Sequence, residues 1–149
     1  MSENLTTFDE LPNSGSGESN SSTFTPRILH VEDNIDIGDM VAFVLAREGY
    51  QVVTARTCRE TLQLIADRLF DLYLIDNVLP DGSGTALSRR IRVVDAENPI
   101  IFCSAWLSQT ELASAREDGA HGYLVKPFTM EDLLGTVTRL LKTGCTANG

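Results

Sequence analysis

The chain has 149 residues, of which 42 % are hydrophobic, and this is the size and composition of one compact domain rather than two. Its formal net charge of -9 comes from 21 acidic and 12 basic residues, which makes the chain a poor candidate for direct contact with nucleic acid or with an anionic membrane surface. The sequence contains no apolar run near the ~20 residues of a membrane span and no signal-peptide pattern.

Residues 1–25 are predicted to form a disordered acidic tail. This stretch is rich in Ser, Thr, Asn and Gly, and its only charged residues are Glu3, Asp9, Glu10 and Glu18. Such a composition buries too little apolar surface to offset the entropy lost on ordering. The domain itself is expected over residues 26–143, and residues 144–149 are expected to be a frayed C-terminus.

The cysteines indicate the reducing environment of the cytoplasm. The chain has an odd number of them, without the spacing of a metal site: Cys58, Cys103 and Cys145. Ordinary thiols are therefore a better interpretation than a disulfide framework.

Beyond the tail, short apolar runs alternate with amphipathic stretches. In chain order the patterns predict a strand over 27–31, a helix over 34–48, a strand over 50–55, a helix over 59–69, a strand over 72–75, a helix marked by Leu87, Ile91 and Val94, a strand over 99–103, a helix over 108–118, a strand over 122–125, and a helix striped by Leu133, Leu134, Val137, Leu140 and Leu141. Thr57 can cap the second helix, with Glu60 in the capping-box position. Five such strand–helix units predict an α/β fold, a doubly wound parallel sheet with helices on both faces.

Chemically active side chains stand where the predicted strands end. Ligands of such sheets bind outside the carboxyl ends of the strands, which share one edge. The first strand ends in Glu32 and Asp33, the third in Asp76, the fourth in Ser104 and the fifth in Lys126. Three carboxylates, a hydroxyl and an ammonium group are therefore expected to converge on one shallow pocket.

This combination of groups predicts a magnesium-dependent phosphoryl acceptor. Carboxylates that lie this close repel one another unless a cation intervenes, and Mg²⁺ accepts carboxylate ligands while leaving room for a phosphate. Lys126 and Ser104 suit phosphoryl oxygens, and Asp76 is placed to attack phosphorus. The turn-rich loop over residues 79–84 can expose a backbone carbonyl, and Val78 is well placed to offer its own to the metal.

The ordered motifs resemble the receiver domain of two-component response regulators. The resemblance covers roughly residues 26–143 and rests on Glu32-Asp33, on Asp76 with Pro80 and Gly84, on Ser104-Ala105 and on Lys126-Pro127-Phe128. It implies the flavodoxin-like strand order 2-1-3-4-5 of single-domain, CheY-like receivers.

The resemblance also implies a role for each position. Asp33 would bind Mg²⁺ directly, with Glu32 near it or acting through water. Asp76 would be both a ligand and the phosphoacceptor, and the Val78 carbonyl would complete the protein's metal contacts. Ser104 and Lys126 would hold the phosphoryl oxygens, Tyr123 would be the aromatic switch residue, and the Lys126–Pro127 bond would be cis.

The expected function is that of a signalling switch rather than an enzyme. A histidine kinase or a histidine phosphotransfer protein would donate the phosphoryl group to Asp76, as in a phosphorelay. Ser104 would then move toward the phosphoryl group, and Tyr123 would fill the vacated space. The fourth helix, fifth strand and fifth helix would present a changed surface to a downstream protein. No output domain is expected within the chain, which could equally be a receiver cut from a larger hybrid kinase or regulator.

Two other classes share this architecture. A phosphatase with an aspartyl nucleophile would need a second acid at position 78, where the sequence has Val78. A flavin binder would need a phosphate-cradling loop after the first strand, where Glu32 and Asp33 would repel the phosphate.

Three further side chains can be interpreted from their positions in the sequence. His30 lies inside a buried strand, where a core histidine with satisfied hydrogen bonds is expected rather than a phosphorelay histidine. Trp106 is either a packing residue or a partner contact. The resemblance implies that Val78 and Trp106 flank the approach of water to the phosphoryl group, and neither side chain can orient water. Self-dephosphorylation is therefore expected to be slow.

Overall fold

The computed structural model describes residues 24–105, 108–117 and 119–148, with side chains as far as residue 142. Nearly all of the expected tail over residues 1–25 lies outside the described residues, and so does Trp106. Within the described part of the chain, no helix combines the length and apolar character needed to cross a membrane.

The centre of the fold is a five-stranded parallel sheet. Its strands are β2 (Arg27–Val31), β3 (Gln51–Ala55), β4 (Leu72–Asp76), β7 (Ile100–Ser104) and β8 (Gly122–Val125). They lie in the order β3-β2-β4-β7-β8, which is the predicted order 2-1-3-4-5. The chain goes outward from β2 to β3 and then returns to β4 on the other side. The carboxyl ends of β2 and β4 therefore form the switch point at which such sheets bind ligands.

Four helices connect these strands and a fifth follows β8, and a side chain caps the start of each of these five helices. The helices are α2 (Ile35–Arg47), α3 (Cys58–Asp67), α4 (Gly84–Val94), α5 (Gln109–Glu117) and α6 (Met130–Asn148). The residue before each helix accepts a backbone N–H from the first turn of that helix: Asn34, Thr57, Ser83, Ser108 and Thr129.

The predicted Thr57 cap is confirmed, but the capping box differs from the prediction. The side chain of Glu60 accepts the N–H of Arg56 at 2.9 Å, one residue before the expected partner. The N–H groups of Cys58 and Arg59 donate to the carboxylate of Asp81, which lies in the loop after β4. The start of α3 is therefore held by the tertiary structure as well as by its own sequence.

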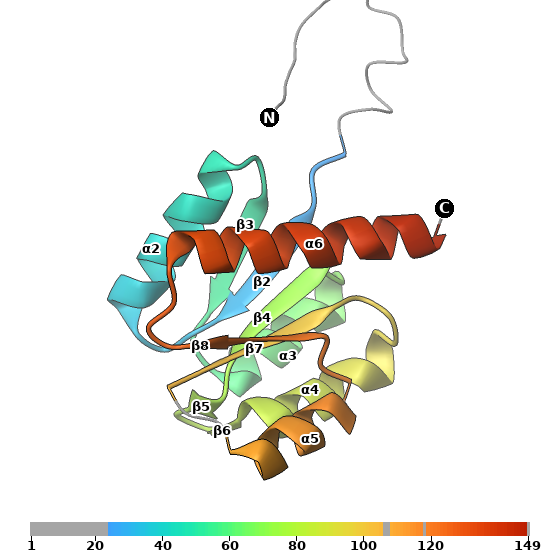
Figure 1. Ribbon diagram of the computed structural model, residues 1–149. Coiled ribbons are helices and arrows are strands. Elements are labelled where there is room, and N and C mark those ends of the chain that lie inside the picture. Colours follow the sequence, from blue (N-terminus) through green and yellow to red (C-terminus); the bar gives the residue numbers. More distant parts are fainter. Residues whose placement is uncertain (1–23, 106–107, 118, 149) are drawn as a thin grey trace, which may run out of the picture.

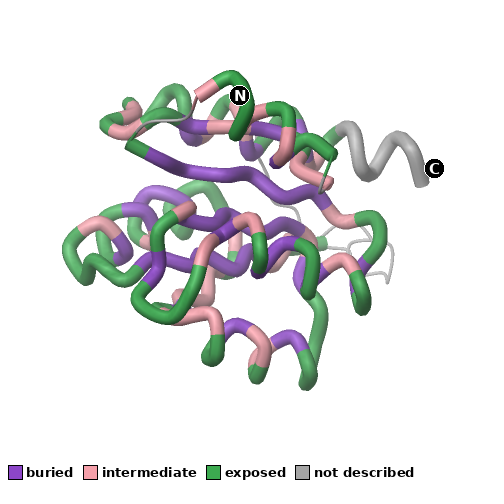
Figure 2. The backbone as a smooth tube through the Cα atoms, turned by 90° about the horizontal axis from the view of Figure 1, so that it is seen from below, coloured by how far each residue is buried: buried purple, intermediate pink, exposed green. Residues whose placement is uncertain are grey.

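The sheet lies between two layers of helices (Figure 1). Helices α2 and α6 cover one face, and α3, α4 and α5 cover the other. Each face has its own apolar core, and Figure 2 shows the buried chain running through the middle of the molecule. Every residue of β4 and β7 is buried. This explains why their sequences are near-continuous apolar runs rather than alternating ones.

Three details differ from the sequence patterns. The loop after β4 contains a small antiparallel hairpin of β5 (Val78–Leu79) and β6 (Gly82–Ser83). Met40 and Val94, which fit the apolar stripes of their helices, are exposed because each lies at the edge of its stripe. Helix α6 continues to Asn148, beyond the last leucine of its stripe. Fraying of its end stays a prediction.

Candidate functional site

Backbone hydrogen bonds hold the carboxyl ends of β4, β7 and β8 together. The N–H of Asn77, just after β4, donates to the carbonyl of Cys103 at 2.9 Å. The N–H of Lys126, just after β8, donates to the carbonyl of Ser104 at 2.8 Å. The sheet therefore places Asp76, Ser104 and Lys126 at one edge, as the sequence predicts.

Three carboxylates meet at this edge. Glu32, Asp33 and Asp76 each offer an oxygen, and these oxygens all lie within 4.8 Å of one another. Glu32 and Asp76 are buried, whereas Asp33 is exposed. A group of carboxylate oxygens that is open to solvent on one side fits a hard divalent cation such as Mg²⁺, because this ion keeps several of its own water ligands. These residues therefore fit the predicted metal site.

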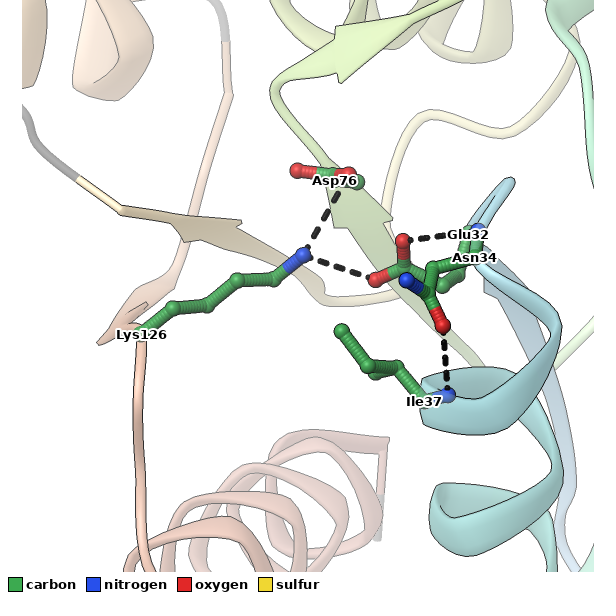
Figure 3. Close-up of polar contacts among 5 residues, drawn as sticks. All are labelled: Glu32, Asn34, Ile37, Asp76 and Lys126. Atoms are coloured by element: carbon green, nitrogen blue, oxygen red, sulfur yellow. Dashed lines mark hydrogen bonds and ion pairs between the residues drawn. The ribbon is translucent and has the colours of Figure 1, made fainter.

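Lys126 reaches into the acidic cluster (Figure 3). Its Nζ lies 2.8 Å from Oε1 of Glu32 and 3.3 Å from Oδ2 of Asp76. Burial disfavours the charged ammonium, but the hydrogen bond to Glu32 and the charge of Asp76 outweigh burial and raise the pKa of Lys126. Lys126 therefore stays protonated and neutralises part of the negative charge around Asp76.

Glu32 is the most deeply placed of the three acids. Burial raises its pKa, against the lowering effect of the hydrogen bonds from Lys126 and from the N–H of Asn34. The Asn34 N–H lies 3.2 Å from Oε2, and the Asn34 side chain caps α2 by accepting the N–H of Ile37 at 3.0 Å. The first turn of α2 thus fixes the position of the Glu32 carboxylate, with Lys126 on its other oxygen.

The two predicted switch residues lie on neighbouring strands. Ser104 is buried at the end of β7, and Tyr123 is half-buried on β8, where it packs against the core under α5. The Tyr123 hydroxyl donates to the carbonyl of Leu112 at 3.0 Å, which ties β8 to the middle of α5. The Lys126–Pro127 bond is cis, as the resemblance implies.

A family model described as the response regulator receiver domain matches residues 28–138. The chain belongs to the response regulator receiver family. It is 35 % identical over 111 residues to the transcriptional regulatory protein DltR of Streptococcus agalactiae, with 74 % of this chain and 50 % of DltR covered. It is 32 % identical over 117 residues to the phosphate regulon transcriptional regulatory protein PhoB of Pseudomonas aeruginosa, with 77 % and 51 % covered. The receiver spans about half the length of the curated relatives it matches.

The fold agrees with this assignment. A CheY-like receiver domain protein from Methanospirillum hungatei superposes with a TM-score of 0.80 at 31 % identity, and the match covers 83 % of this chain and 99 % of that one. Receiver domains generally use Mg²⁺ and interact with histidine kinases, and the acidic cluster of this receiver is consistent with the use of Mg²⁺. The match places the chain among receivers.

The receiver's loop after Asp76 is packed tightly against the strand that carries it. A Cβ on Gly84 would lie only 2.6 Å from the carbonyl oxygen of Asp76, so no larger residue fits without a backbone shift. The Gly84 N–H donates to the carbonyl of Asn77 at 2.8 Å, which closes the loop on itself. Val78, two residues after Asp76, is 72 % exposed. That its carbonyl binds the metal stays a prediction.

His30 differs from its prediction in one respect. It is a buried core residue, as expected, but its Nδ1 has no hydrogen-bond partner among the described residues. Burial and the nearby charge of Lys126 lower the pKa of His30 to about 4, so the ring is neutral at physiological pH. A neutral ring inside the sheet is not placed to carry a phosphoryl group.

Sequence reasoning missed one residue beside the site. Asp81, in the β5–β6 turn, accepts the N–H groups of Cys58 and Arg59 at the start of α3. The Pro80-Asp81-Gly82 sequence signals a turn. It carries no signal for the partner, which lies on a helix that precedes β4 in the chain.

Proposed function

We propose that this receiver is a phosphorylation switch in which Asp76 is the phosphoacceptor. The observation that carries the proposal is the position of Asp76: it is buried at the end of β4, shares Lys126 with Glu32, and contributes an oxygen to the three-carboxylate cluster. A carboxylate that is held between a lysine and a potential metal site is suited to attack a phosphoryl group, because the charge of that group can be neutralised on both sides.

The proposed donor is a phosphohistidine of a histidine kinase or of a histidine phosphotransfer protein. An oxygen of Asp76 attacks phosphorus, the phosphorus–nitrogen bond breaks, and the imidazole leaves with the bonding electrons. Lys126 then pairs with an oxygen of the phosphoryl group, and the Ser104 hydroxyl donates to another. Bound Mg²⁺, held by Asp33, Asp76, the Val78 carbonyl and, through water, Glu32, would supply positive charge to the same oxygens.

Exposed apolar side chains around the site support a docked protein donor. Ile35 follows the Asn34 cap of α2, Val78 lies just after Asp76, and Val125 directly precedes Lys126, and all three are exposed. Apolar residues that surround a polar pocket are typical of a protein interface. The proposal places this exchange in the cytoplasm, where ATP supplies such kinases.

The proposed output is a change of the surface formed by α5, β8 and α6. Phosphorylation adds about -1.5 to -2 charges next to Ser104, by analogy with ordinary phosphomonoesters. Ser104 is drawn toward the phosphoryl group, and Tyr123 moves into the space behind it. Because the Tyr123 hydroxyl holds the Leu112 carbonyl, this movement acts directly on α5. A downstream protein, or a further domain as in the longer relatives, would read the new surface.

The test is a change in mass. The whole chain is incubated with Mg²⁺ and acetyl phosphate, and its intact mass is measured. The wild type should gain one phosphoryl group, Asp76→Asn should gain none, and the matched control Asp67→Asn, at the exposed end of α3, should behave as wild type. A wild type without any gain, or an undiminished gain in Asp76→Asn, would overturn the proposal.

A further inference from the structure

Asp81 joins the loop after the phosphoacceptor to the start of α3. Its two carboxylate oxygens accept the N–H of Cys58 at 2.8 Å and the N–H of Arg59 at 3.0 Å. The first N–H groups of a helix have no partner within the helix, and a carboxylate is their strongest acceptor. These two bonds lower the pKa of Asp81, an exposed residue. Asp81 is therefore an ionised clamp at neutral pH.

Close packing supports the same attachment. A Cβ on Gly82 would lie 3.2 Å from Sγ of Cys58, so the β5–β6 turn lies directly against the first residue of α3. At its other end the loop is closed by the bond from Gly84 to Asn77. The loop that contains Val78 is thus closed at its base and clamped at its tip.

The start of α3 also supports the acids that follow β2. Helix α3 follows β3 almost directly, and the carbonyl of Ala55, the last residue of β3, accepts the N–H of Glu32 at 2.8 Å. The chain from Ala55 to Cys58 is therefore bound to Glu32 on one side and to Asp81 on the other. The two halves of the acidic site, Glu32-Asp33 and the loop after Asp76, share this short support.

We propose that Asp81 is a positioning residue for the divalent cation of this receiver. By clamping the β5–β6 turn to α3, it holds the Val78 carbonyl and Asp76 at a set spacing from Glu32 and Asp33. Asp81 itself contacts neither the cation nor the phosphoryl group. Groups that orient metal ligands from behind affect metal affinity strongly, because they remove the cost of ordering the ligands. This inference rests on the proposed function, in which the site takes Mg²⁺.

The experiment compares two caps of the same helix. Thr57→Ala removes the other side-chain acceptor at the start of α3, and it leaves the loop after Asp76 untouched. The wild-type chain and its variants Asp81→Ala, Asp81→Asn and Thr57→Ala are titrated with Mg²⁺ by calorimetry. Each is also melted without Mg²⁺, so that loss of the cap alone is measured separately.

Asp81→Ala should weaken Mg²⁺ binding about 10-fold, and its rate of phosphorylation by acetyl phosphate should recover at saturating Mg²⁺. Asp81→Asn should lie between Asp81→Ala and wild type, because its amide oxygen can still accept one of the two N–H groups. Thr57→Ala should lower the melting temperature but leave the Kd for Mg²⁺ unchanged.

The outcomes separate this inference from the proposed function. If Asp81→Ala binds Mg²⁺ as the wild type does, or if Thr57→Ala weakens binding equally, Asp81 is only a helix cap and the proposed function stands. If the wild type binds no Mg²⁺, both proposals fall. If Asp81→Ala does not fold, Asp81→Asn decides in the same way.

Discussion

Nζ of Lys126 lies 2.8 Å from Oε1 of Glu32, whose side chain is only 2 % exposed, whereas that of Lys126 is 20 % exposed. The acid is therefore fixed in the interior, and the lysine reaches it from the open side of the site. A phosphoryl group on Asp76 would compete with Glu32 for the same ammonium group.

Lys126→Met should reduce the free energy of unfolding at pH 7 by about 1–3 kcal/mol, because Glu32 is left as a buried charge without its cation. The loss should shrink as the pH falls through the pKa of Glu32, which burial raises, because a protonated Glu32 needs no cation. Urea unfolding at several pH values measures this. The double variant Glu32→Gln/Lys126→Met should recover much of the loss, and strictly additive effects would show that the pair is not coupled.

Gly84→Ala should both destabilise the receiver and slow its phosphorylation. Its methyl group would lie 2.6 Å from the Asp76 carbonyl oxygen, and the resulting backbone shift should cost about 1–3 kcal/mol. Gly135→Ala is the matched control, because a Cβ on Gly135, within α6, meets nothing within 4 Å. That change should stabilise the protein by about 0.5–1 kcal/mol. Equal effects of the two variants on unfolding would contradict the role given to Gly84.

His121 should make the receiver less stable as the pH falls below about 6.5. Its Nδ1 lies 3.3 Å from Nη2 of Arg92 and 3.4 Å from the N–H of Ile100, and it can accept a hydrogen bond only when it carries no proton. Burial and the charge of Arg92 lower its pKa, so the unfolded chain binds the proton first. Stability is therefore fully present above the unfolded pKa and is lost as the pH falls toward the lower folded value.

His121→Gln is the variant that checks this pH dependence. Its free energy of unfolding should change less between pH 7 and 5 than that of the wild type, because glutamine does not titrate. His30 is unchanged in both proteins, so its own titration cancels in the comparison. Parallel pH profiles for the two proteins would count against a role for His121.

Val78→Asn should speed the loss of phosphate from Asp76. The exposed apolar side chain of Val78, two residues after Asp76, cannot orient water, whereas an amide can. The decay of the phosphorylated protein, followed by intact mass after the phosphodonor is removed, measures the rate. Val93→Asn, at an exposed position on α4, is the control for a general effect of the substitution. An unchanged decay in Val78→Asn would show that this side chain does not limit the approach of water.

Much of the fold could be predicted because local patterns and the final packing agree. The two fully buried strands, β4 and β7, have continuous apolar sequences, and the Thr57 cap of α3 follows from residues that are neighbours in the chain. The two-residue strands β5 and β6 could not be predicted, because strands this short have no periodicity of their own. In the folded protein, Gly84 fastens this loop at its base and Asp81 fastens it at its tip.

The hydrogen-bond partners of some side chains could not be predicted from the sequence, for a related reason. Glu60 bonds to Arg56, and Nδ1 of His30 is left without a partner among the described residues. Each of these outcomes depends on small displacements between elements that are distant in the chain. Residue types and spacing carry no information about such displacements.

The sequence by itself determined which groups reach the edge of the sheet, since parallel strands place their carboxyl ends together and Glu32, Asp33, Asp76, Ser104 and Lys126 follow those ends. Only the tertiary structure decided how these groups are used: that Lys126 is shared between Glu32 and Asp76, and that Asp81 clamps the loop to α3. The physical reason is the separation along the chain of the residues that interact. Strand and helix patterns are set by neighbours in the chain, whereas hydrogen bonds and ion pairs depend on tenths of an ångström between elements that meet only in the folded protein.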